Sequence, residues 1–383
     1  MPLAGVQGAA PPGLPAPSYP SPHPGMSSAP GPVVAVVLPG GEGFAPGAVG
    51  AVGLIVHRLA GAAGGFRVVV LAQAGGAVFA DRAVLPVRAW PFPRLYARAR
   101  YPWAVLRGVR RLRPALVEVH NRPALALFLA RRLRVPVTLF LHNDPQGMRR
   151  AGTVAERGRL LARLAGVAVV SEFLRGRLRE GLPPGGAPVV VVPNGIDLAG
   201  LPAALPAAAR EPLILFVGRP IVEKGVDTFL RAMALALPDL PGWRAVLLGS
   251  RDHTPGGEVP VADGVEVLGY RPHPEVLAWM GRAAMVVMPS RWEEPFGLAA
   301  LEAMAMGAAL LCSARGGLPE VVGDAAVVID PEDAVGVAEA VVALAGDLAR
   351  REELAARGRA RAAGFGVPRA AAELDGLRRA ALA

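Results

Sequence analysis

The amino-acid sequence predicts an α/β fold with two doubly wound domains in tandem, each built on a mostly parallel sheet. Short valine-rich runs bounded by glycine or proline alternate with longer amphipathic stretches along most of the chain. Runs with so little polar alternation are typical of strands that are buried on both faces. Helical stretches between such strands imply βαβ units with right-handed crossovers. Because 383 residues exceed what one hydrophobic core usually holds, we expect two domains.

The expected strands fall into two sets along the chain. The first set comprises residues 33–38, 67–71, 116–119, 136–141, 167–171 and 188–192. The second set comprises residues 213–217, 244–248, 265–268, 285–288, 309–312 and 326–329. In open parallel sheets the ligand-binding loops follow the carboxyl ends of the strands, so we expect functional residues directly after these runs.

These two sets define the domain boundaries. Residues 32–197 are expected to form an N-terminal Rossmann-like domain, and residues 213–365 a C-terminal one. Residues 198–212 show little periodicity and are interpreted as the linker. Residues 1–31 are dense in proline, serine and glycine, which predicts a disordered tail. Residues 366–383 are expected to form a C-terminal helix that can cross back to the N-terminal domain.

Composition excludes several classes of protein. With 52% apolar and 19% charged residues, the chain is typical of a globular protein and not of a disordered one. The single cysteine, Cys312, cannot form an intramolecular disulfide and is interpreted as a small buried apolar residue. Neither a membrane-spanning run nor a signal peptide is predicted. The net charge of +10, mostly from arginine, suits a phosphate-bearing partner or a solvated surface, and no nucleic-acid-binding signature accompanies it.

The segment from Pro289 to Glu302 is the most informative about chemistry. A buried strand is expected to end before it, and a helix to begin near Phe296 and Gly297. Free N–H groups at such a helix start attract anions. Glu294 and Glu302 can accept hydrogen bonds from the hydroxyl groups of a sugar and of a ribose. Acids that only complement the helix dipole are the alternative, which the intervening Pro-Phe-Gly disfavours.

A second segment, residues 216–225, predicts a tight turn for anions. A strand runs into Gly218, and a helix is expected to begin near Gly225. Arg219 and Lys224 lie at the mouth of this turn, where two fixed cations can neutralise a diphosphate. The alternative is a solvated loop with two basic residues, and the flanking glycines favour the anion-binding turn.

Together these segments resemble the large family of retaining glycosyltransferases called family four, or glycosyl transferases group 1, which has the GT-B fold of two Rossmann-like domains facing a cleft. Residues 192–197 are similar to its interdomain Pro-Asn-Gly-Ile-Asp segment, and residues 218–225 to its diphosphate-binding Gly-Arg and Glu-Lys-Gly. Glu294 and Glu302 match its pair of glutamates, and residues 316–320 resemble the Gly-Gly-x-x-Glu turn that follows. The order and spacing of these motifs make the resemblance specific.

The resemblance implies a nucleotide-sugar site in the C-terminal domain. By this likeness Arg219 and Lys224 hold the donor diphosphate, Glu302 binds the ribose, and Glu294 holds the transferred sugar. The other implied donor-binding residues are Gly218, Pro295, Phe296, Gly297 and Leu298. The family retains anomeric configuration through a front-face displacement, in which the leaving phosphate helps to deprotonate the acceptor. We expect no metal and no other cofactor, because the sequence has no Asp-x-Asp motif.

The N-terminal domain would meet the acceptor. Gly40, Gly41 and Glu42 follow the first strand and resemble the family's glycine loop near the donor phosphates, although a plain connection is an equal alternative. His142 follows the end of the fourth strand and is therefore expected to face the cleft. A similar histidine of the family contacts the donor sugar, so the resemblance implies a catalytic role for His142. A structural role for this histidine is the alternative.

Three further residues at strand ends are interpreted more narrowly. His120 and Arg122 end the strand before that of His142 and are candidates for the acceptor side. Ser171 begins a helix at the end of the fifth strand and is expected to cap it.

The sequence thus predicts a cytoplasmic, metal-independent retaining hexosyltransferase that uses a UDP-, GDP- or ADP-sugar. By analogy with similar family members, the acceptor is a cell-envelope glycan or a lipid-linked acceptor, such as lipopolysaccharide core, O-antigen or capsule. Peripheral contact with an anionic membrane is compatible with the charge. Two alternatives stay open: a sugar-nucleotide 2-epimerase, and a non-catalytic protein that binds a nucleotide-sugar.

Overall fold

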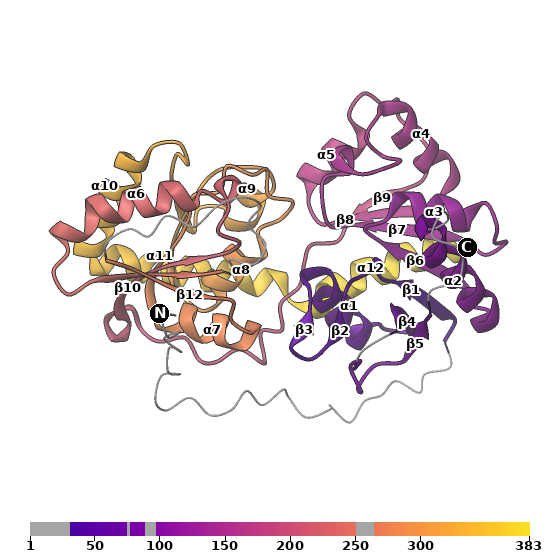
Figure 1. Ribbon diagram of the computed structural model, residues 1–383, viewed down its shortest axis with the longest axis horizontal. Helices are drawn as coiled ribbons and strands as arrows, with labels where there is room; N and C mark the ends of the chain where they lie inside the picture. The colour runs from indigo at the N-terminus through magenta and orange to yellow at the C-terminus, as the bar shows by residue number, and fades with distance from the viewer. Residues whose placement is uncertain (1–30, 75–76, 89–96, 250–263) are drawn as a thin grey trace, which may run out of the picture.

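The computed structural model describes residues 31–74, 77–88, 97–249 and 264–383. Nearly all of the predicted tail, residues 1–31, lies outside these ranges. The described chain forms two α/β domains that lie next to each other along the longest axis of the molecule (Figure 1). Each domain has its own parallel sheet with helices packed on both sides. The predicted fold class, two doubly wound Rossmann-like domains, is confirmed.

The N-terminal domain is built on a seven-stranded parallel sheet with the order β5-β4-β1-β6-β7-β8-β9. Its strands are β1 (Val33–Val37), β4 (Arg67–Gln73), β5 (Val84–Val87), β6 (Leu116–His120), β7 (Val137–Leu141), β8 (Gly166–Val169) and β9 (Val189–Val191). Its helices are α1 (Ala51–Ala62), α2 (Ala97–Leu112), α3 (Pro123–Ala130), α4 (Val154–Arg163) and α5 (Glu172–Arg179). A short 3-10 turn, η2 (Pro145–Gly147), follows β7.

The C-terminal domain is built on a six-stranded parallel sheet with the order β12-β11-β10-β13-β14-β15. Its strands are β10 (Glu211–Val217), β11 (Arg244–Leu248), β12 (Val265–Gly269), β13 (Ala283–Met288), β14 (Ala309–Cys312) and β15 (Ala326–Val328). Its helices are α6 (Val226–Ala236), α7 (His273–Arg282), α8 (Leu298–Ala305), α9 (Leu318–Val322), α10 (Ala334–Gly346) and α11 (Leu348–Ala362). The 3-10 turns are η3 (Ala207–Ala209), η4 (Val222–Lys224), η5 (Leu237–Asp239) and η7 (Ala363–Phe365).

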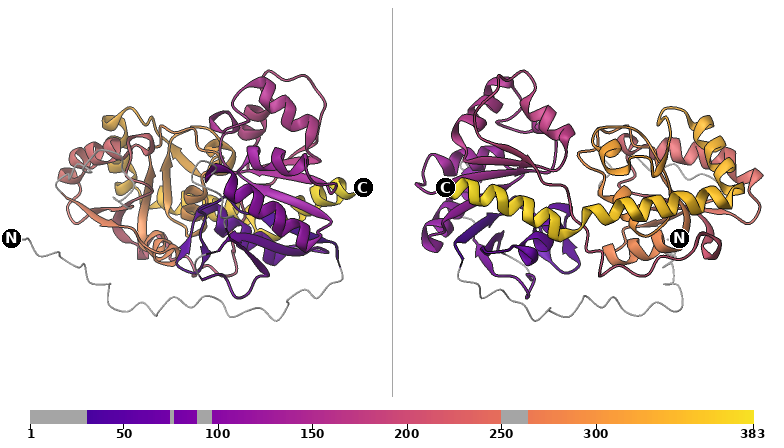
Figure 2. Two further views of the ribbon diagram at one scale, coloured as in Figure 1. Left: turned by 45° about the vertical axis from the view of Figure 1, so that its right-hand side comes forward. Right: turned by 180° about the vertical axis from the view of Figure 1, so that it is seen from behind.

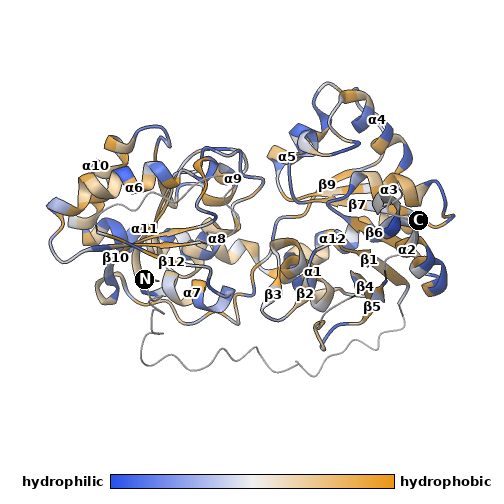
Figure 3. Ribbon diagram, viewed as in Figure 1, coloured by the Kyte–Doolittle hydropathy of each residue, from blue (hydrophilic) through white to orange (hydrophobic). Residues whose placement is uncertain are grey.

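The strands are valine-rich because both faces of each sheet are covered. Central strands such as β6, β7 and β13 are buried at every position. In Figure 3 the strands are mostly hydrophobic, whereas hydrophilic residues gather on the outer faces of the helices. Cys312 lies fully buried in β14, as predicted, and its burial raises the pKa of the thiol to about 12.

Three local features differ from the prediction. The edge strand β5 was not predicted, because it contains Pro86 and lacks a continuous apolar run. A proline and partly exposed residues are tolerated here because β5 lies at the edge of the sheet. A small hairpin, β2 (Phe44–Ala45) with β3 (Ala48–Val49), stands between the glycine loop and α1. β10 begins at Glu211, inside the predicted linker of residues 198–212. Each difference concerns a segment whose strand character comes from pairing with neighbours and not from an apolar run.

The last helix, α12 (Val367–Leu382), leaves the C-terminal domain and packs on the N-terminal one. It contacts α1, β6, β8 and β9, and Figure 2 shows it crossing between the domains. At the crossing point Ile196 forms a parallel bridge with Gly366. The backbones approach closely here, since a Cβ on Gly195 would lie 2.7 Å from the Cα of Val367.

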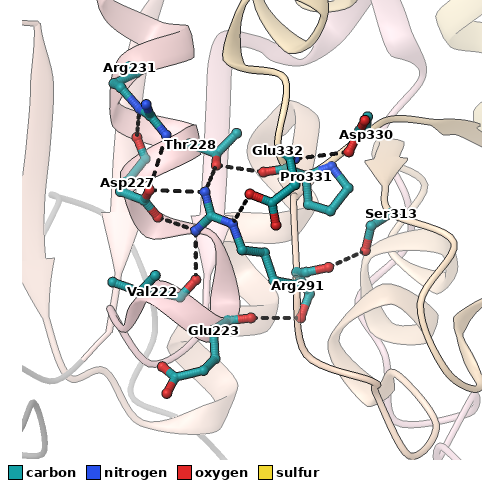
Figure 4. A network of polar contacts seen from close by, with 11 residues as sticks. Val222, Glu223, Asp227, Thr228, Arg231, Arg291, Ser313, Asp330, Pro331 and Glu332 are labelled. Carbon is teal, nitrogen blue, oxygen red and sulfur yellow. Dashed lines mark hydrogen bonds and ion pairs between the residues drawn. The ribbon is translucent and has the colours of Figure 1, made fainter.

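Arg291 joins the loop after β13 to the turn after β10 (Figure 4). Its guanidinium donates to both carboxylate oxygens of Asp227 at 2.5 and 3.0 Å, to Thr228 Oγ1 at 2.7 Å, and to the carbonyl oxygen of Val222 at 2.9 Å. It also pairs with Glu332 at 2.9 Å. The Arg291 side chain is 17% exposed, so these contacts are partly shielded from water. They lock together the two loops that carry the motifs.

We expect Arg291→Met to lower the free energy of unfolding of the C-terminal domain by about 1–3 kcal/mol, because several hydrogen bonds to charged groups are lost. Arg231→Met is the matched control, since Arg231 pairs with the same Asp227 from an exposed position and should change stability by less than about 0.5 kcal/mol. Urea denaturation measures both. Equal effects of the two substitutions would contradict this account.

We expect Leu374→Ala to destabilise the N-terminal domain by about 2–5 kcal/mol, because it leaves a cavity under α12. Leu374 is 1% exposed, whereas the neighbouring Glu373 faces solvent, so Glu373→Ala serves as the control. Circular dichroism during urea unfolding reports the change. If Leu374→Ala left the unfolding midpoint unaltered, α12 would not be part of the N-terminal core.

Candidate functional site

The two motif segments meet at one edge of the C-terminal sheet. β10 and β13 are neighbouring parallel strands, paired at Leu215 and Val286, so their carboxyl ends lie side by side. A cavity of about 180 Å³ opens there. It is lined by Phe216, Val217, Gly218, Lys224, Met288, Ser290, Glu294, Gly297, Leu298 and Ala299. The cation of one motif and an acid of the other therefore face the same space.

The turn after β10 needs glycine at two positions. Gly218 has φ of +153° and Gly225 has φ of +72°, a backbone region that side-chain-bearing residues rarely adopt. A Cβ on Gly225 would lie 1.7 Å from the carbonyl oxygen of Pro289, so glycine lets this turn approach the other motif loop. Arg219 is exposed on the turn, outside the residues that line the cavity.

Lys224 and Glu294 form an ion pair across the cavity. The Nζ of Lys224 lies 2.5 Å from Oε1 of Glu294, and Ser290 Oγ donates to the same oxygen at 2.9 Å. The Glu294 side chain is 10% exposed and that of Lys224 is 22% exposed. Lys224 is also the only lysine in a chain that otherwise uses arginine. A compact ammonium on a flexible stem, and not a planar guanidinium, occupies this position.

The glutamate loop is held by the glycine pair that follows β14. A Cβ on Gly316, where φ is +62°, would lie 2.3 Å from the carbonyl oxygen of Glu294. The N–H of Gly317 donates to that same carbonyl oxygen at 2.6 Å. Gly297, with φ of +103°, turns the chain into α8, and Phe296 is buried beside Phe365. The loop thus presents its backbone N–H groups at the start of α8.

Glu302 lies one turn inside α8, buried, with its carboxylate between the two domains. Its Oε1 is 2.7 Å from Nε2 of His273 and 3.6 Å from Nη2 of Arg58. Arg58, on α1, also donates to the carbonyl oxygen of Gly195 at 3.2 Å. Sequence reasoning named neither His273 nor Arg58, because nothing in the local pattern distinguishes them from other surface residues of their helices.

Two contacts bring the N-terminal sheet edge against the glutamate loop. Ser171 Oγ accepts from the N–H of Leu174, so this serine caps α5 as predicted, and it donates to the carbonyl oxygen of Pro295 at 2.6 Å. The carboxylate of Glu320 accepts from the N–H groups of Glu172 and Phe173 at 2.7 and 2.6 Å. The carboxyl edge of the first sheet therefore faces the motif loops of the second domain.

The predicted glycine loop of the N-terminal domain is held by internal contacts. Gly41 donates its N–H to the side chain of Gln73 at 2.9 Å, and Glu42 Oε1 accepts from the N–H of Gly53 at 3.0 Å in the first turn of α1. A Cβ on Gly40 would touch the ring of Tyr101 at 3.2 Å. The carboxylate of Glu42 thus caps α1, which gives this residue a structural role.

The two predicted histidines lie against each other. His120 Nδ1 and His142 Nε2 are 2.9 Å apart, and both side chains are buried. Arg122 is exposed beside them, with its guanidinium donating to the carbonyl oxygen of Asn121 at 3.3 Å. The side chain of Asn121 in turn accepts from the N–H of His142 at 3.1 Å.

The two halves of the chain match two family descriptions in order. Residues 52–199 match "Glycosyltransferase Family 4", and residues 211–347 match "Glycosyl transferases group 1". The two matched ranges together cover well over half of the chain. The first range covers most of the N-terminal domain from α1 onward, and the second begins with β10 at Glu211 and ends after α10.

Similar proteins are found among curated sequences. The glycogen synthase of Mycobacterium tuberculosis strain CDC 1551 is 33% identical over 281 residues, which cover 66% of this chain and 64% of the relative. The D-inositol 3-phosphate glycosyltransferase of Xylanimonas cellulosilytica is 36% identical over 208 residues, which cover 48% of this chain and 49% of the relative. The chain spans less than two thirds of the length of these curated relatives.

A solved structure shares the fold over nearly its whole length. The Anabaena protein HepE, determined in complex with UDP-glucose, superposes with a TM-score of 0.72 at 18% identity, covering 90% of this chain and 99% of that one. At this identity the likeness concerns the fold alone. With both domain matches in order and this shared architecture, the chain belongs to glycosyltransferase family 4 (glycosyl transferases group 1), with the GT-B fold.

Proposed function

We propose that the protein is a metal-independent, retaining glycosyltransferase that moves a hexose from a nucleotide-sugar to an acceptor bound between its domains. The observation that carries the proposal is the meeting of Lys224 and Glu294 at one cavity, formed by two loops that follow adjacent parallel strands. The names of the similar glycosyltransferases, and the UDP-glucose in the complex of HepE, support a nucleotide-sugar donor.

In the proposed donor site, cationic side chains face the diphosphate, and carboxylates face the hydroxyl groups of the ribose and of the sugar. Lys224 and Arg219 stabilise the diphosphate, and their effect grows as negative charge develops on the leaving group. The free N–H groups at the start of α8 add to this positive potential. Glu302 accepts hydrogen bonds from the ribose hydroxyls, in competition with His273 and Arg58. Glu294 is released from Lys224 to accept hydrogen bonds from the transferred sugar.

The reaction proposed for this site is a front-face displacement with retention. A double displacement needs a carboxylate that is free to attack the anomeric carbon. Glu294 is the only carboxylate among the residues that line the cavity in the described part of the chain, and its Oε1 is held by Lys224 and Ser290. The leaving phosphate is therefore proposed to take the proton of the acceptor hydroxyl, as the new bond forms on the same face.

The nucleotide part of this proposal predicts different defects for two variants. Glu302→Gln should weaken UDP, GDP or ADP binding about 10-fold, because the ribose loses a charged acceptor. Lys224→Ala should slow transfer about 10²–10³-fold with a smaller effect on binding, because its charge acts mainly on the leaving group. Glu339→Gln, on the exposed side of α10, is the neutral control.

The measurements are a thermal-shift panel of nucleotides and nucleotide-sugars, followed by single-turnover transfer to a glycan acceptor. The ligand that raises the melting temperature most identifies the donor base. Lys224→Arg tests whether charge alone suffices at this position. If Glu302→Gln and Lys224→Ala both turned over the donor at the parental rate, the site assignment would be wrong.

We further propose that the enzyme acts at the cytoplasmic face of the membrane, on a cell-envelope glycan or a lipid-linked acceptor. None of the helices in the described ranges combines the length and the apolar character that a bilayer crossing requires. The surface of the N-terminal domain supports peripheral contact instead. Between Arg82 and Asp144 the sequence has a single acidic residue, Glu118, which is buried. Exposed arginines lie on α2 (Arg107, Arg110 and Arg111) and in the turn after α3 (Arg131, Arg132 and Arg134).

This surface predicts binding to vesicles that contain phosphatidylglycerol, weakening as salt rises because charged lipid attracts it. Arg110→Gln with Arg111→Gln should reduce co-sedimentation several-fold. Arg231→Gln with Arg357→Gln, which removes the same charge from the C-terminal domain, is the control. If vesicle binding changed neither with salt nor with the Arg110 and Arg111 substitutions, this face would be ruled out as the membrane contact.

A further inference from the structure

A buried chain of polar groups runs from α12 to His142 through the N-terminal sheet. The guanidinium of Arg378 donates from Nε and Nη2 to the two carboxylate oxygens of Glu118, at 2.9 Å each. Glu118 Oε1 lies 3.0 Å from Nε2 of His120, and His120 Nδ1 lies 2.9 Å from Nε2 of His142. Glu118, His120 and Arg378 are each at most 2% exposed. No step of the proposed transfer uses Arg378, Glu118 or His120.

The first link of this chain is an ionised carboxylate. Burial alone would raise the pKa of Glu118, but Arg378 and the hydrogen bond with His120 lower it to about 2. Asp375, one turn before Arg378 on α12, holds the guanidinium from the other side at 2.9 Å. An ionised carboxylate only accepts hydrogen bonds. The contact with Glu118 therefore requires a hydrogen on Nε2 of His120.

The position of the hydrogen on His120 determines its position on His142, because the two rings share a hydrogen bond. In the neutral form of His120, a hydrogen on Nε2 leaves a lone pair at Nδ1, which accepts from Nε2–H of His142. Burial lowers the pKa of His142 well below its ordinary value, so His142 is neutral. A neutral imidazole with its hydrogen on Nε2 carries a bare acceptor at Nδ1.

That acceptor has no partner. Within the described residues, Nδ1 of His142 is a buried nitrogen without a hydrogen bond. His142 directly follows β7, and β7 pairs with β8. At the carboxyl end of β8, Ser171 contacts the carbonyl oxygen of Pro295 in the loop before α8. Buried polar atoms are almost always satisfied, and a missing bond costs about 1–3 kcal/mol. An unfilled acceptor at the sheet edge that faces the other domain indicates a ligand hydroxyl.

We propose that Glu118 and Arg378 are positioning residues that hold the hydrogen of His142 on Nε2, and so keep its Nδ1 as an acceptor for a sugar hydroxyl in the domain cleft. This inference rests on the proposed function for the ligand class, whereas the tautomer follows from the buried contacts with His120 in its neutral form. The C-terminal helix thereby contributes to the chemistry of the site through a side chain that never touches the ligand.

The opposite arrangement has a defined cause. A glutamine at position 118 can donate its amide hydrogen to Nε2 of His120, which then carries its own hydrogen on Nδ1. His120 would in that case donate to Nε2 of His142, and Nδ1 of His142 would become a donor. The ligand hydroxyl that donates to Nδ1 of His142 in the parental protein would then lose its acceptor, although both histidines would still be present.

The test is the tautomer of His142 in ¹⁵N-histidine-labelled full-length protein, read from long-range ¹H–¹⁵N spectra near pH 8, with signals assigned by His142→Gln. The parental protein should show hydrogen on Nε2. Glu118→Gln should move it to Nδ1 or average the two forms, whereas Glu118→Asp, which keeps an ionised acceptor, should preserve the parental pattern. Glu373→Gln on the exposed side of α12 is the control.

Activity provides the second readout. In Glu118→Gln the kcat of transfer should fall about 10–100-fold while the Kd for the free nucleotide stays at the parental value, because the lost contact is to the sugar. If this variant does not fold, Glu118→Gln with Arg378→Met removes both buried charges together and carries the same readout. A hydrogen on Nδ1 of His142 in the parental protein, or a tautomer unchanged by loss of the carboxylate, would overturn the inference even if the protein transfers sugar. Loss of transfer activity in the parent with the expected tautomers would instead reject the proposed function.

Discussion

The parallel pairing of β10 with β13 is the constraint on which the site depends. Parallel neighbours end at the same edge of a sheet, so the turn after one strand and the loop after the other must share that edge. Glycine at position 225 lets the two loops touch, and Arg291 ties them together from behind. Lys224 and Glu294 then meet at 2.5 Å across a cavity.

The N-terminal domain contacts the motif residues of the C-terminal domain at three separate places. Ser171 reaches the carbonyl oxygen of Pro295, Glu320 holds the first N–H groups of α5, and Arg58 approaches the carboxylate of Glu302. Each contact joins a strand end or helix of one domain to a motif loop of the other. The carboxylate of Glu302 is thereby tied to the position of the N-terminal domain, because Arg58 approaches it from α1.

Because α12 crosses to the N-terminal domain, residues near the end of the chain form part of the core of that domain. Arg378 is fully buried against Glu118 on β6, a residue 260 positions earlier in the chain. Buried charges in such a place need partners of opposite charge, and Glu118 and Asp375 together surround Arg378. Glu118 also contacts His120, which in turn contacts His142 at 2.9 Å.

The motifs and the strands could be read from the sequence, because they depend on local order: apolar runs, glycines at turns, and glutamates at a helix start. Those features predicted both sheets, the tight turn at Gly218 and Gly225, and the family. Contacts between residues far apart in the chain could not be read, since nothing near Arg58, His273 or Arg378 indicates a partner. The edge strand β5 was missed for the same reason, as pairing and not its own pattern makes it a strand. Local propensity thus determined the elements and their order, whereas the crossing of α12 and the packing of the two domains decided which charges face each other.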